Sequence, residues 1–384
     1  MSKRKKIRFG IIGLGLMGKE FCSAAARWCH LLDEDPIPVI TGICSKSESA
    51  WKWYTDNFPE ILIKTTDYKE LINSDKIDAI YCAVPHNLHE QFYIDIIKSG
   101  KHLLAEKPFG IDKKANTNIL AAISLNPDVI VRCSSEFPYF PACQELIKWL
   151  ISGKYGRLIE VKTGFHHSSD MDLKKSINWK RQVEFCGEYG CMGDLGMHTL
   201  HIPFHMGWKP LNVYADLQKI VETRPDGKGG QAACTTWDNA VLTCKSIDPK
   251  TGKEFSMVVE TKRMAPGSTN TWFIEVYGTE GSAKFSTHDP KAFRYLTTHG
   301  KEQGWTRIDI GSQSAIPTIT GGIFETGFSD AFQQMIAAFM SELSGGPSNH
   351  FFKNLSPEET RLSHVLFTAA LQSYKTGRRI DLDL

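Results

Sequence analysis

The sequence predicts an α/β protein with two domains. A Rossmann-type, doubly wound parallel sheet is expected over residues 1–135, and an α+β domain with a large, mostly antiparallel, open-faced sheet over 136–384. A chain of 384 residues suits about two domains. Strand-like and helix-like segments alternate in the first part, which is typical of a parallel sheet covered on both faces. Beyond residue 135 apolar and polar positions alternate, as in half-buried antiparallel strands.

The strands of the first domain are short apolar runs rich in β-branched residues, and its helices carry apolar residues at helical spacing. The predicted strands cover residues 7–12, 39–44, 77–84, 101–105 and 129–133. The predicted helices between them cover residues 17–31, 49–57, 89–99 and 113–125.

The second domain is expected to open with a helix over 143–152 and to close with one over about 357–376. Ser356 before Pro357 and two early glutamates favour the start of the last helix, and Gly377 its end. We expect this helix to pack back near the domain junction. The strands predicted between the two helices cover residues 157–165, 213–219, 240–246, 255–262 and 272–277.

Composition excludes several classes of protein. Hydrophobic residues make up 41% of the chain and charged residues 23%, which excludes a disordered chain. The formal charge of +2 argues against nucleic acid or a membrane surface as a partner. No apolar run is long enough to span a membrane, and the glycine-rich stretch 9–17 after the basic N-terminus does not suit a signal peptide. Ten scattered cysteines without a C-x-x-C pair predict reduced thiols and a cytoplasmic location.

A glycine-rich turn joins the first predicted strand to the first helix and reads Gly13-Leu14-Gly15-Leu16-Met17-Gly18. In this pattern Gly13 permits a tight turn, Gly15 lets a pyrophosphate approach the backbone, and Gly18 lets the helix pack close to the strand. The positive end of the helix dipole favours the same anion. We interpret the turn as a dinucleotide site, and the alternative is a strand–helix turn without a ligand.

The end of the second predicted strand bears on the choice of dinucleotide. An NAD site usually carries an acidic residue there, whereas this chain has Ser45-Lys46-Ser47. A hydroxyl and an ammonium group suit a 2′-phosphate, so the sequence favours NADP(H) over NAD(H). The alternative is that Lys46 is an exposed loop lysine without a ligand.

Two further segments are candidates for catalysis. Lys107 lies at the carboxyl end of a predicted strand, and Pro108 after it holds the lysine at a turn that suits a cis peptide bond. Asp194 and His198 are four residues apart at the start of a glycine-rich helix and share one face of it. Taken singly, Asp194 could be a helix N-cap and His198 a buried structural histidine.

Taken together, these segments resemble the glucose–fructose oxidoreductase and inositol dehydrogenase (Gfo/Idh/MocA) family over nearly the whole chain. The resemblance rests on an ordered set of motifs: the glycine turn, A-V-P-H-N-L-H at 83–89, G-K-H-L-L-A-E-K-P at 100–108, G-D-L-G-M-H at 193–198 and V-Y-G-T-E-G at 276–281. It implies an NAD(P)-dependent oxidoreductase that transfers a hydride between nicotinamide and a secondary alcohol or ketone of a sugar, cyclitol or related polyol. It also implies a homodimer or homotetramer formed through the C-terminal sheet.

The resemblance implies roles for individual residues. Lys107, Asp194 and His198 are expected to be catalytic and to contact the substrate. His198 would exchange the hydroxyl proton, Lys107 would stabilise the developing alkoxide, and Asp194 would bind a neighbouring hydroxyl. The expected cofactor-binding residues are Gly13, Gly15, Leu16, Met17, Gly18, Ser45, Lys46, Ala83, Pro85, His86, His89, Glu106 and Lys107.

Substrate contacts are further expected from His166, at the end of a predicted strand, and Trp179, in the loop before the catalytic helix. Either residue could instead simply pack within its loop. The common R-F-x-P segment of the family lacks its arginine at 135–141, and His198 and His201 stand in an H-x-x-H spacing that does not suit a zinc site. No metal is expected.

Two other functions remain open at this point. The first is a non-catalytic dinucleotide-binding sensor, which would not need the lysine, aspartate and histidine together. The second is a glycosidase or eliminase of similar fold that recycles bound NAD.

Overall fold

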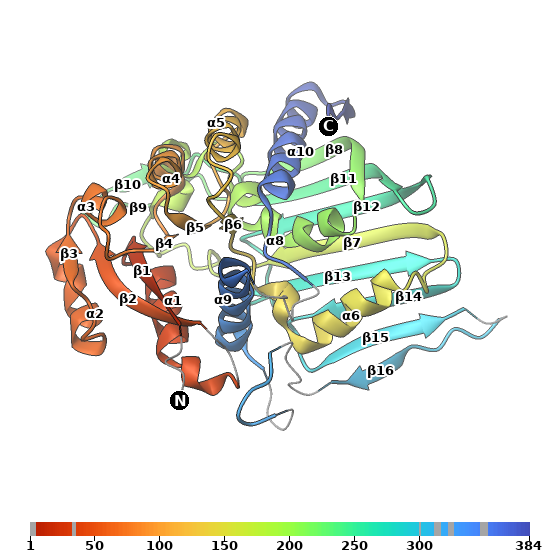
Figure 1. Ribbon diagram of the computed structural model, residues 1–384. Coiled ribbons are helices and arrows are strands. Elements are labelled where there is room, and N and C mark those ends of the chain that lie inside the picture. Colours follow the sequence, from red (N-terminus) through yellow and green to blue (C-terminus); the bar gives the residue numbers. More distant parts are fainter. Residues whose placement is uncertain (1–4, 33–35, 299–300, 311–315, 322–325, 346–351) are drawn as a thin grey trace. The chain divides into compact units, whose positions relative to one another are not determined.

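The computed structural model describes residues 5–32, 36–298, 301–310, 316–321, 326–345 and 352–384. Two compact units make up the chain (Figure 1). The first contains residues 1–110, 114–139 and 312–357, and the second contains 111–113, 140–311 and 358–384. Residues 136–139 and 312–357, which the sequence analysis placed in the second domain, therefore group with the first unit.

The first unit is built on a six-stranded parallel sheet with the strand order β3-β2-β1-β4-β5-β6, as expected for a Rossmann fold. Ile12 at the end of β1 pairs with Cys44 and with Cys82, and Cys82 pairs in turn with Ala105. The carboxyl ends of four strands therefore lie along one edge of the sheet. The strands are β1 (Lys6–Ile12), β2 (Ile37–Cys44), β3 (Ile63–Thr65), β4 (Ala79–Cys82), β5 (His102–Ala105) and β6 (Val131–Cys133).

Helices cover this sheet through aromatic and aliphatic side chains. Phe21 packs between Phe9 of β1 and Tyr81 of β4, with ring centroids 5.0 and 4.5 Å apart. The helices are α1 (Leu16–Ala26), α2 (Trp51–Asn57), α3 (Tyr68–Ile72), α4 (His89–Lys98), α5 (Lys113–Ser124) and α9 (Phe328–Ser344), with short 3₁₀ turns at Trp28–His30, Glu48–Ala50, His86–Leu88 and Phe137–Tyr139.

Helix α9 joins the first unit because its polar groups bond to α1. Asp330 pairs with Arg27 at 2.9 Å, and the Gln333 amide donates to the backbone carbonyls of Ala24 and Arg27. Its residues 331–340 are all buried. Its large apolar residues, among them Phe332, Met335 and Phe339, recur at helical spacing, although no helix was predicted for this segment.

A nine-stranded sheet forms the second unit, with the order β16-β15-β14-β13-β7-β12-β11-β8-β17. Every neighbouring pair is antiparallel except β7 with β12. The strands are β7 (Leu158–His166), β8 (Lys209–Gln218), β11 (Asn239–Asp248), β12 (Lys253–Lys262), β13 (Thr271–Gly278), β14 (Gly281–Ser286), β15 (Ala292–Thr297), β16 (Thr306–Asp309) and β17 (Ile380–Asp381). A separate two-stranded ribbon consists of β9 (Thr223–Pro225) and β10 (Gln231–Ala233).

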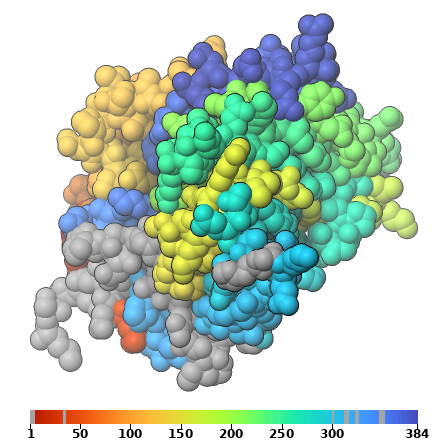
Figure 2. Space-filling model, turned by 90° about the vertical axis from the view of Figure 1, so that its right-hand side faces the viewer, coloured from red at the N-terminus to blue at the C-terminus, as the bar shows by residue number. Residues whose placement is uncertain are grey.

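Helices lie against one face of the large sheet, so the predicted open-faced sheet is confirmed (Figure 1). Val161, Thr163 and Phe165 of β7 are buried, whereas Glu160, Lys162 and His166, which point to the other face, are partly exposed. Figure 2 shows residues near 150–160, in yellow, against the teal and cyan residues of much later strands, as the pairing of β7 with β12 and β13 requires. The helices are α6 (Pro141–Ile151), α7 (Val183–Cys186), α8 (Cys191–His205) and α10 (Pro357–Thr376), with a 3₁₀ turn at Trp179–Arg181.

All ten cysteines are free thiols, and nine of them are buried, with Cys29 exposed. None of the helices in the described ranges has the length and apolar character needed to cross a membrane.

Candidate active site

The glycine turn begins directly after β1 and leads into α1. Gly13 has a φ of +94°, and a Cβ at this position would overlap with the carbonyl oxygen of Ala83, at the end of β4. A Cβ on Gly18 would overlap with the carbonyl oxygen of Gly13 and approach the Tyr54 hydroxyl to 2.9 Å. These two glycines are therefore required by the packing of strand, turn and helix.

Gly15 is different, because a Cβ there would meet no atom within 4 Å. Gly15 is the N-cap of α1, and Leu16 after it is 81% exposed. The backbone N–H groups of the first helical turn thus adjoin open space, where the helix dipole favours a negative group. The open space beside the first turn is compatible with the pyrophosphate site that the sequence predicts at Gly15, Leu16 and Met17.

Ser45 and Lys46 follow the end of β2, next to the glycine turn. The Gly13 N–H donates to the carbonyl oxygen of Cys44 at 3.1 Å, which ties the two turns together. Ser45 is half-buried and accepts a hydrogen bond from the backbone of Ser47 at 3.4 Å, and Lys46 is exposed. The structure therefore brings these two residues to the same sheet edge as the glycines.

The segment from Ala83 to His89 leaves the carboxyl end of β4 at this edge. The Ala83 N–H donates to the carbonyl oxygen of Ile12 at 2.8 Å. His86 and His89 are buried, with ring centroids 5.4 Å apart, and His89 Nε2 lies 3.0 Å from the Val84 carbonyl oxygen. Pro85 is half-buried between them and the strand. Packing thus fixes the imidazole rings of His86 and His89.

Lys107 follows β5 at the neighbouring position along the edge. The expected cis peptide bond between Lys107 and Pro108 is confirmed. The Glu106 carboxylate accepts a hydrogen bond from the Tyr81 hydroxyl at 2.7 Å, and the Glu106 carbonyl accepts one from Tyr93 at 2.8 Å. Glu106, expected to bind cofactor, is 7% exposed, so its carboxylate anchors the turn that holds half-buried Lys107.

Glu136, for which the sequence predicts no role, lies near Lys107. It is 4% exposed, and burial raises its pKa to about 8, with the charge of Glu106 acting in the same direction and that of Lys107 opposing it. The only feature of the sequence that could have indicated Glu136 is the R-F-x-P pattern of the family, in which this acidic residue replaces the arginine.

Asp194 and His198 lie one turn apart on α8, in the second unit. Gly190, the residue before α8, has a φ of +55°. A Cβ at this position would lie 2.6 Å from the backbone nitrogen of Trp237, so there is no room for a side chain. A Cβ on Gly196 would lie 2.5 Å from the Phe367 ring of α10. The glycine-rich motif therefore lets other segments pack closely against α8.

Two cations hold the Asp194 carboxylate, which is buried. Lys180 Nζ lies 2.9 Å from Oδ1, and Arg263 Nη2 lies 3.3 Å from Oδ2. The sequence predicts a role for neither cation, because Lys180 and Arg263 meet Asp194 only through the fold. Asp194 is thus a buried carboxylate with a cation on each oxygen.

His198 is 5% exposed and is fixed by its surroundings in the sheet. The ring of Phe165 in β7 stands edge-on to the imidazole, with centroids 5.6 Å apart. The indole N–H of Trp272 donates to the His198 backbone carbonyl at 3.0 Å. Half-buried Trp179 lies in the same unit, with the ammonium of Lys180 5.7 Å from its ring centroid.

His166 is not brought together with these residues. It follows Phe165 on β7 and therefore points to the opposite face of the sheet from His198. On that face His166 Nε2 donates to Oε2 of Glu260 at 3.0 Å, and Lys262 also pairs with Glu260. The expected substrate contact of His166 therefore finds no support in its position.

The Glu260 pair allows a prediction about stability. The hydrogen bond from His166 lowers the pKa of Glu260 to about 2, with Lys262 acting in the same direction. Since the folded pKa lies below the usual 4.5, this stabilisation is complete above about pH 4.5 and is lost as the pH falls towards 2. We expect Glu260→Gln to lower the free energy of unfolding by about 1–3 kcal/mol at pH 7.

Urea unfolding at several pH values measures this effect: the difference in unfolding free energy between Glu260→Gln and the wild type should shrink below about pH 4.5 and close near pH 2. Glu254→Gln is the matched control, because its ion pair with Lys245 is exposed on both sides. A gap that stays constant with pH would show that the carboxylate charge does not stabilise the sheet.

Two protein-family models match the chain, one in each of its two parts. Residues 7–130 match the model of the GFO/IDH/MocA oxidoreductase family, NAD-binding Rossmann fold, and residues 143–284 match the GFO/IDH/MocA C-terminal domain. The chain is 25% identical to levoglucosan dehydrogenase of Pseudarthrobacter phenanthrenivorans over 327 residues, which cover 80% of this chain and 81% of that protein. It is 28% identical to scyllo-inositol 2-dehydrogenase (NADP(+)) IolU of Bacillus subtilis, over 66% of this chain and 76% of that one.

Solved structures show the same fold. A levoglucosan dehydrogenase in complex with NADH and levoglucosan superposes with a TM-score of 0.84 at 20% identity, over 99% of this chain and 100% of the other. An oxidoreductase domain protein from Kribbella flavida superposes with a TM-score of 0.88 at 19% identity, over 99% and 100%. The chain thus belongs to the GFO/IDH/MocA family of oxidoreductases, whose N-terminal domain is an NAD-binding Rossmann fold.

Proposed function

We propose that this protein is an NAD(P)-dependent oxidoreductase that interconverts a secondary alcohol and a ketone of a sugar, cyclitol or related polyol. The observation that carries the proposal is the pairing, in one chain, of the open Gly15 turn with the buried Asp194 and His198 of α8. The sugar and cyclitol dehydrogenases among its relatives support the same substrate class.

The proposed roles follow from the surroundings of each side chain. A nicotinamide dinucleotide, when bound, supplies the hydride acceptor or donor. His198 takes the hydroxyl proton during oxidation and returns it during reduction, which suits an imidazole near neutral pH. Lys107 donates a hydrogen bond to the reacting oxygen and stabilises its negative charge. Asp194 accepts a hydrogen bond from a neighbouring hydroxyl, and Trp179 offers a flat surface to the sugar ring.

A substrate panel tests the proposal. Polyols, cyclitols, free sugars and anhydrosugars are incubated with NAD⁺ or NADP⁺ while the nicotinamide absorbance is followed, and cofactor binding is titrated by fluorescence. Net reduction of cofactor with one class of substrate is expected. Cofactor binding without turnover would favour a sensor, and substrate cleavage without net cofactor reduction would favour the recycled-cofactor enzyme.

We propose NADP(H) as the favoured cofactor, since Ser45 and Lys46 stand where an NAD site usually has an acidic residue. Lys46→Asp should lower the kcat/KM ratio of NADP⁺ to NAD⁺ by about 10- to 150-fold, the effect of one charge-assisted hydrogen bond. Initial rates with both cofactors at several concentrations measure the ratio.

Lys98→Asp is the matched control for this substitution. Lys98 is an exposed lysine in the last turn of α4, at the opposite end of the strands, and its change alters the net charge equally. An unchanged ratio in Lys46→Asp, or an equal change in Lys98→Asp, would remove Lys46 from 2′-phosphate recognition.

We also propose a cytoplasmic homodimer or homotetramer that associates through the nine-stranded sheet. The face opposite the helices carries ionic and aromatic side chains, including Lys162, whose Nζ lies 3.1 Å from Glu160 and 5.8 Å from the Tyr277 ring centroid. Ten free thiols suit a reducing compartment.

A further inference from the structure

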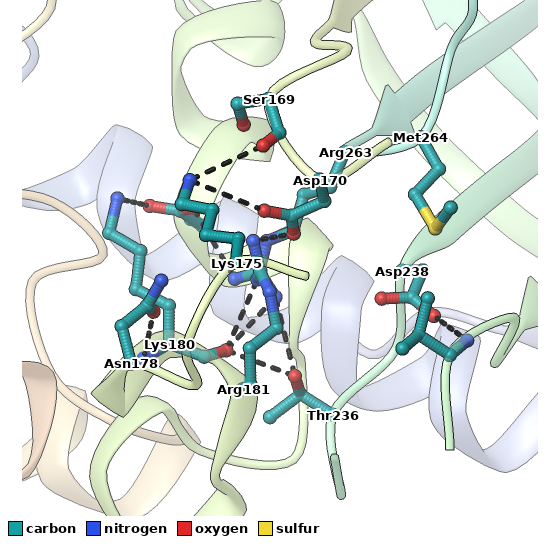
Figure 3. A network of polar contacts seen from close by, with 12 residues as sticks. Ser169, Asp170, Lys175, Asn178, Lys180, Arg181, Thr236, Asp238, Arg263 and Met264 are labelled. Carbon is teal, nitrogen blue, oxygen red and sulfur yellow. Dashed lines mark hydrogen bonds and ion pairs between the residues drawn. The ribbon is translucent and has the colours of Figure 1, made fainter. Parts of the chain in front are cut away.

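The loop before α8 is anchored by buried arginines (Figure 3). Arg181 forms an ion pair with Asp170, and both side chains are almost fully buried. Arg224 donates to the backbone carbonyl of Asp170 at 2.6 Å and to that of Asp172 at 2.7 Å. The mostly irregular loop from residue 170 to 181 is therefore anchored by buried arginines at Asp170, Asp172 and Arg181.

Arg263, directly after β12, links this loop to α8. Its Nη1 donates to the Lys180 carbonyl at 3.0 Å and to the Thr236 hydroxyl at 3.3 Å, while its Nη2 reaches the Gly190 carbonyl at 3.4 Å and the Asp194 carboxylate. Its side chain is only 2% exposed. Arg263 thus fixes the backbone of Lys180 and the carboxylate of Asp194 relative to each other.

Lys180, in contrast to the buried Arg263, is partly exposed to solvent. Its side chain is 37% exposed, yet its ammonium lies 2.9 Å from Asp194, whose side chain is 6% exposed. The Asn178 side chain accepts from the Lys180 backbone N–H at 3.0 Å, and the Thr236 hydroxyl donates to its carbonyl at 3.0 Å. A lysine with a fixed backbone therefore covers the solvent side of a buried carboxylate.

From this geometry we propose that Lys180 is a positioning residue of the substrate site, which holds the Asp194 carboxylate in the orientation that accepts a substrate hydroxyl. This inference rests on the proposed function. Each carboxylate oxygen has two acceptor positions, so Asp194 can bind its two cations and still accept a hydrogen bond. Without the ammonium, the carboxylate keeps Arg263 on Oδ2 but loses the contact that orients Oδ1.

Kinetics of Lys180→Met and Lys180→Arg test the role. Lys180→Met should raise the KM of the polyol substrate by about 10- to 100-fold, the effect of one hydrogen bond to a charged group. Cofactor Kd should change less than about twofold, and Tm by only a few degrees, because the group is a partly exposed side chain. Lys180→Arg should recover most of the loss.

Two comparison variants separate positioning from folding. Lys174→Met removes an exposed lysine of the same loop and should leave KM unchanged. Arg263→Lys should lower Tm and kcat together, because it breaks buried contacts to three segments. If Lys180→Met leaves KM unchanged, or lowers activity only in proportion to Tm as Arg263→Lys does, the proposed role is wrong.

A second measurement does not depend on activity. In competitive acetylation followed by mass spectrometry, Asp194→Asn should raise the labelling of Lys180 relative to Lys174 by about threefold or more, since the ion pair is released. An unchanged ratio overturns the inference even in an active enzyme. If the wild type instead oxidises nothing on the panel, the proposed function fails, while the labelling ratio still decides whether Asp194 holds Lys180.

Discussion

Replacing His198 with alanine or asparagine is expected to lower kcat by about 10²- to 10⁴-fold, the range for loss of a general base. His198 lies on α8 one turn after Asp194, with its ring set edge-on to Phe165. In the proposed reaction no proton leaves the substrate hydroxyl at a useful rate unless a base accepts it. Initial rates with saturating cofactor and substrate measure the loss, and the pH dependence of the remaining activity should flatten.

Asparagine is included because it keeps a polar group of similar size in a buried position, so that the variant can be compared at nearly full stability. His205→Asn is the matched control: His205 ends the same helix and lies 3.3 Å from Glu359. Cofactor Kd should stay close to the wild-type value in all three variants. Near-normal turnover in His198→Asn would mean that another group accepts the proton.

The fold was largely predictable because its elements are locally encoded. The strands of the Rossmann sheet are continuous apolar runs, and the glycine turn marks the start of α1. The predicted helix 17–31 instead ends at Ala26 and continues as a 3₁₀ turn at Trp28–His30. Strand β3, with three residues, is too short to show a strand period, whereas α9 does carry apolar residues at helical spacing and could have been predicted from them.

The residues of the candidate site could be predicted only where they belong to short sequence motifs. Lys107, Asp194 and His198 stand in short ordered segments, and the glycines have steric reasons that the structure makes explicit. Lys180 and Arg263 are 83 residues apart, and nothing local to either indicates that both reach Asp194. The substrate contact predicted for His166 finds no support in its position, because successive residues of a strand point to opposite faces and Phe165 points towards His198.

Lys107→Ala is expected to lower kcat by about 10²- to 10³-fold, the usual cost of removing one donor to a developing oxyanion. The turn that carries Lys107 is held by Tyr81 and Tyr93 through Glu106, so the backbone from which the lysine side chain extends is fixed. Such a group gives more stabilisation to an alkoxide than to a neutral hydroxyl, and its loss should appear in kcat more than in KM. Stopped-flow measurement of cofactor reduction shows whether the chemical step itself is slowed.

Lys101→Met provides the control at the other end of the same strand. Lys101 Nζ donates to the carbonyls of Ser74 and Ile77 at 2.7 and 2.8 Å, so its loss should reduce stability and leave kcat unchanged. Lys107→Arg tests charge against shape, because a guanidinium keeps the positive charge but spreads it over a planar fork. If Lys107→Arg is as slow as Lys107→Ala, the reaction needs the compact ammonium at one point. If both variants turn over like the wild type, the alkoxide is stabilised elsewhere and the proposed role of Lys107 is wrong.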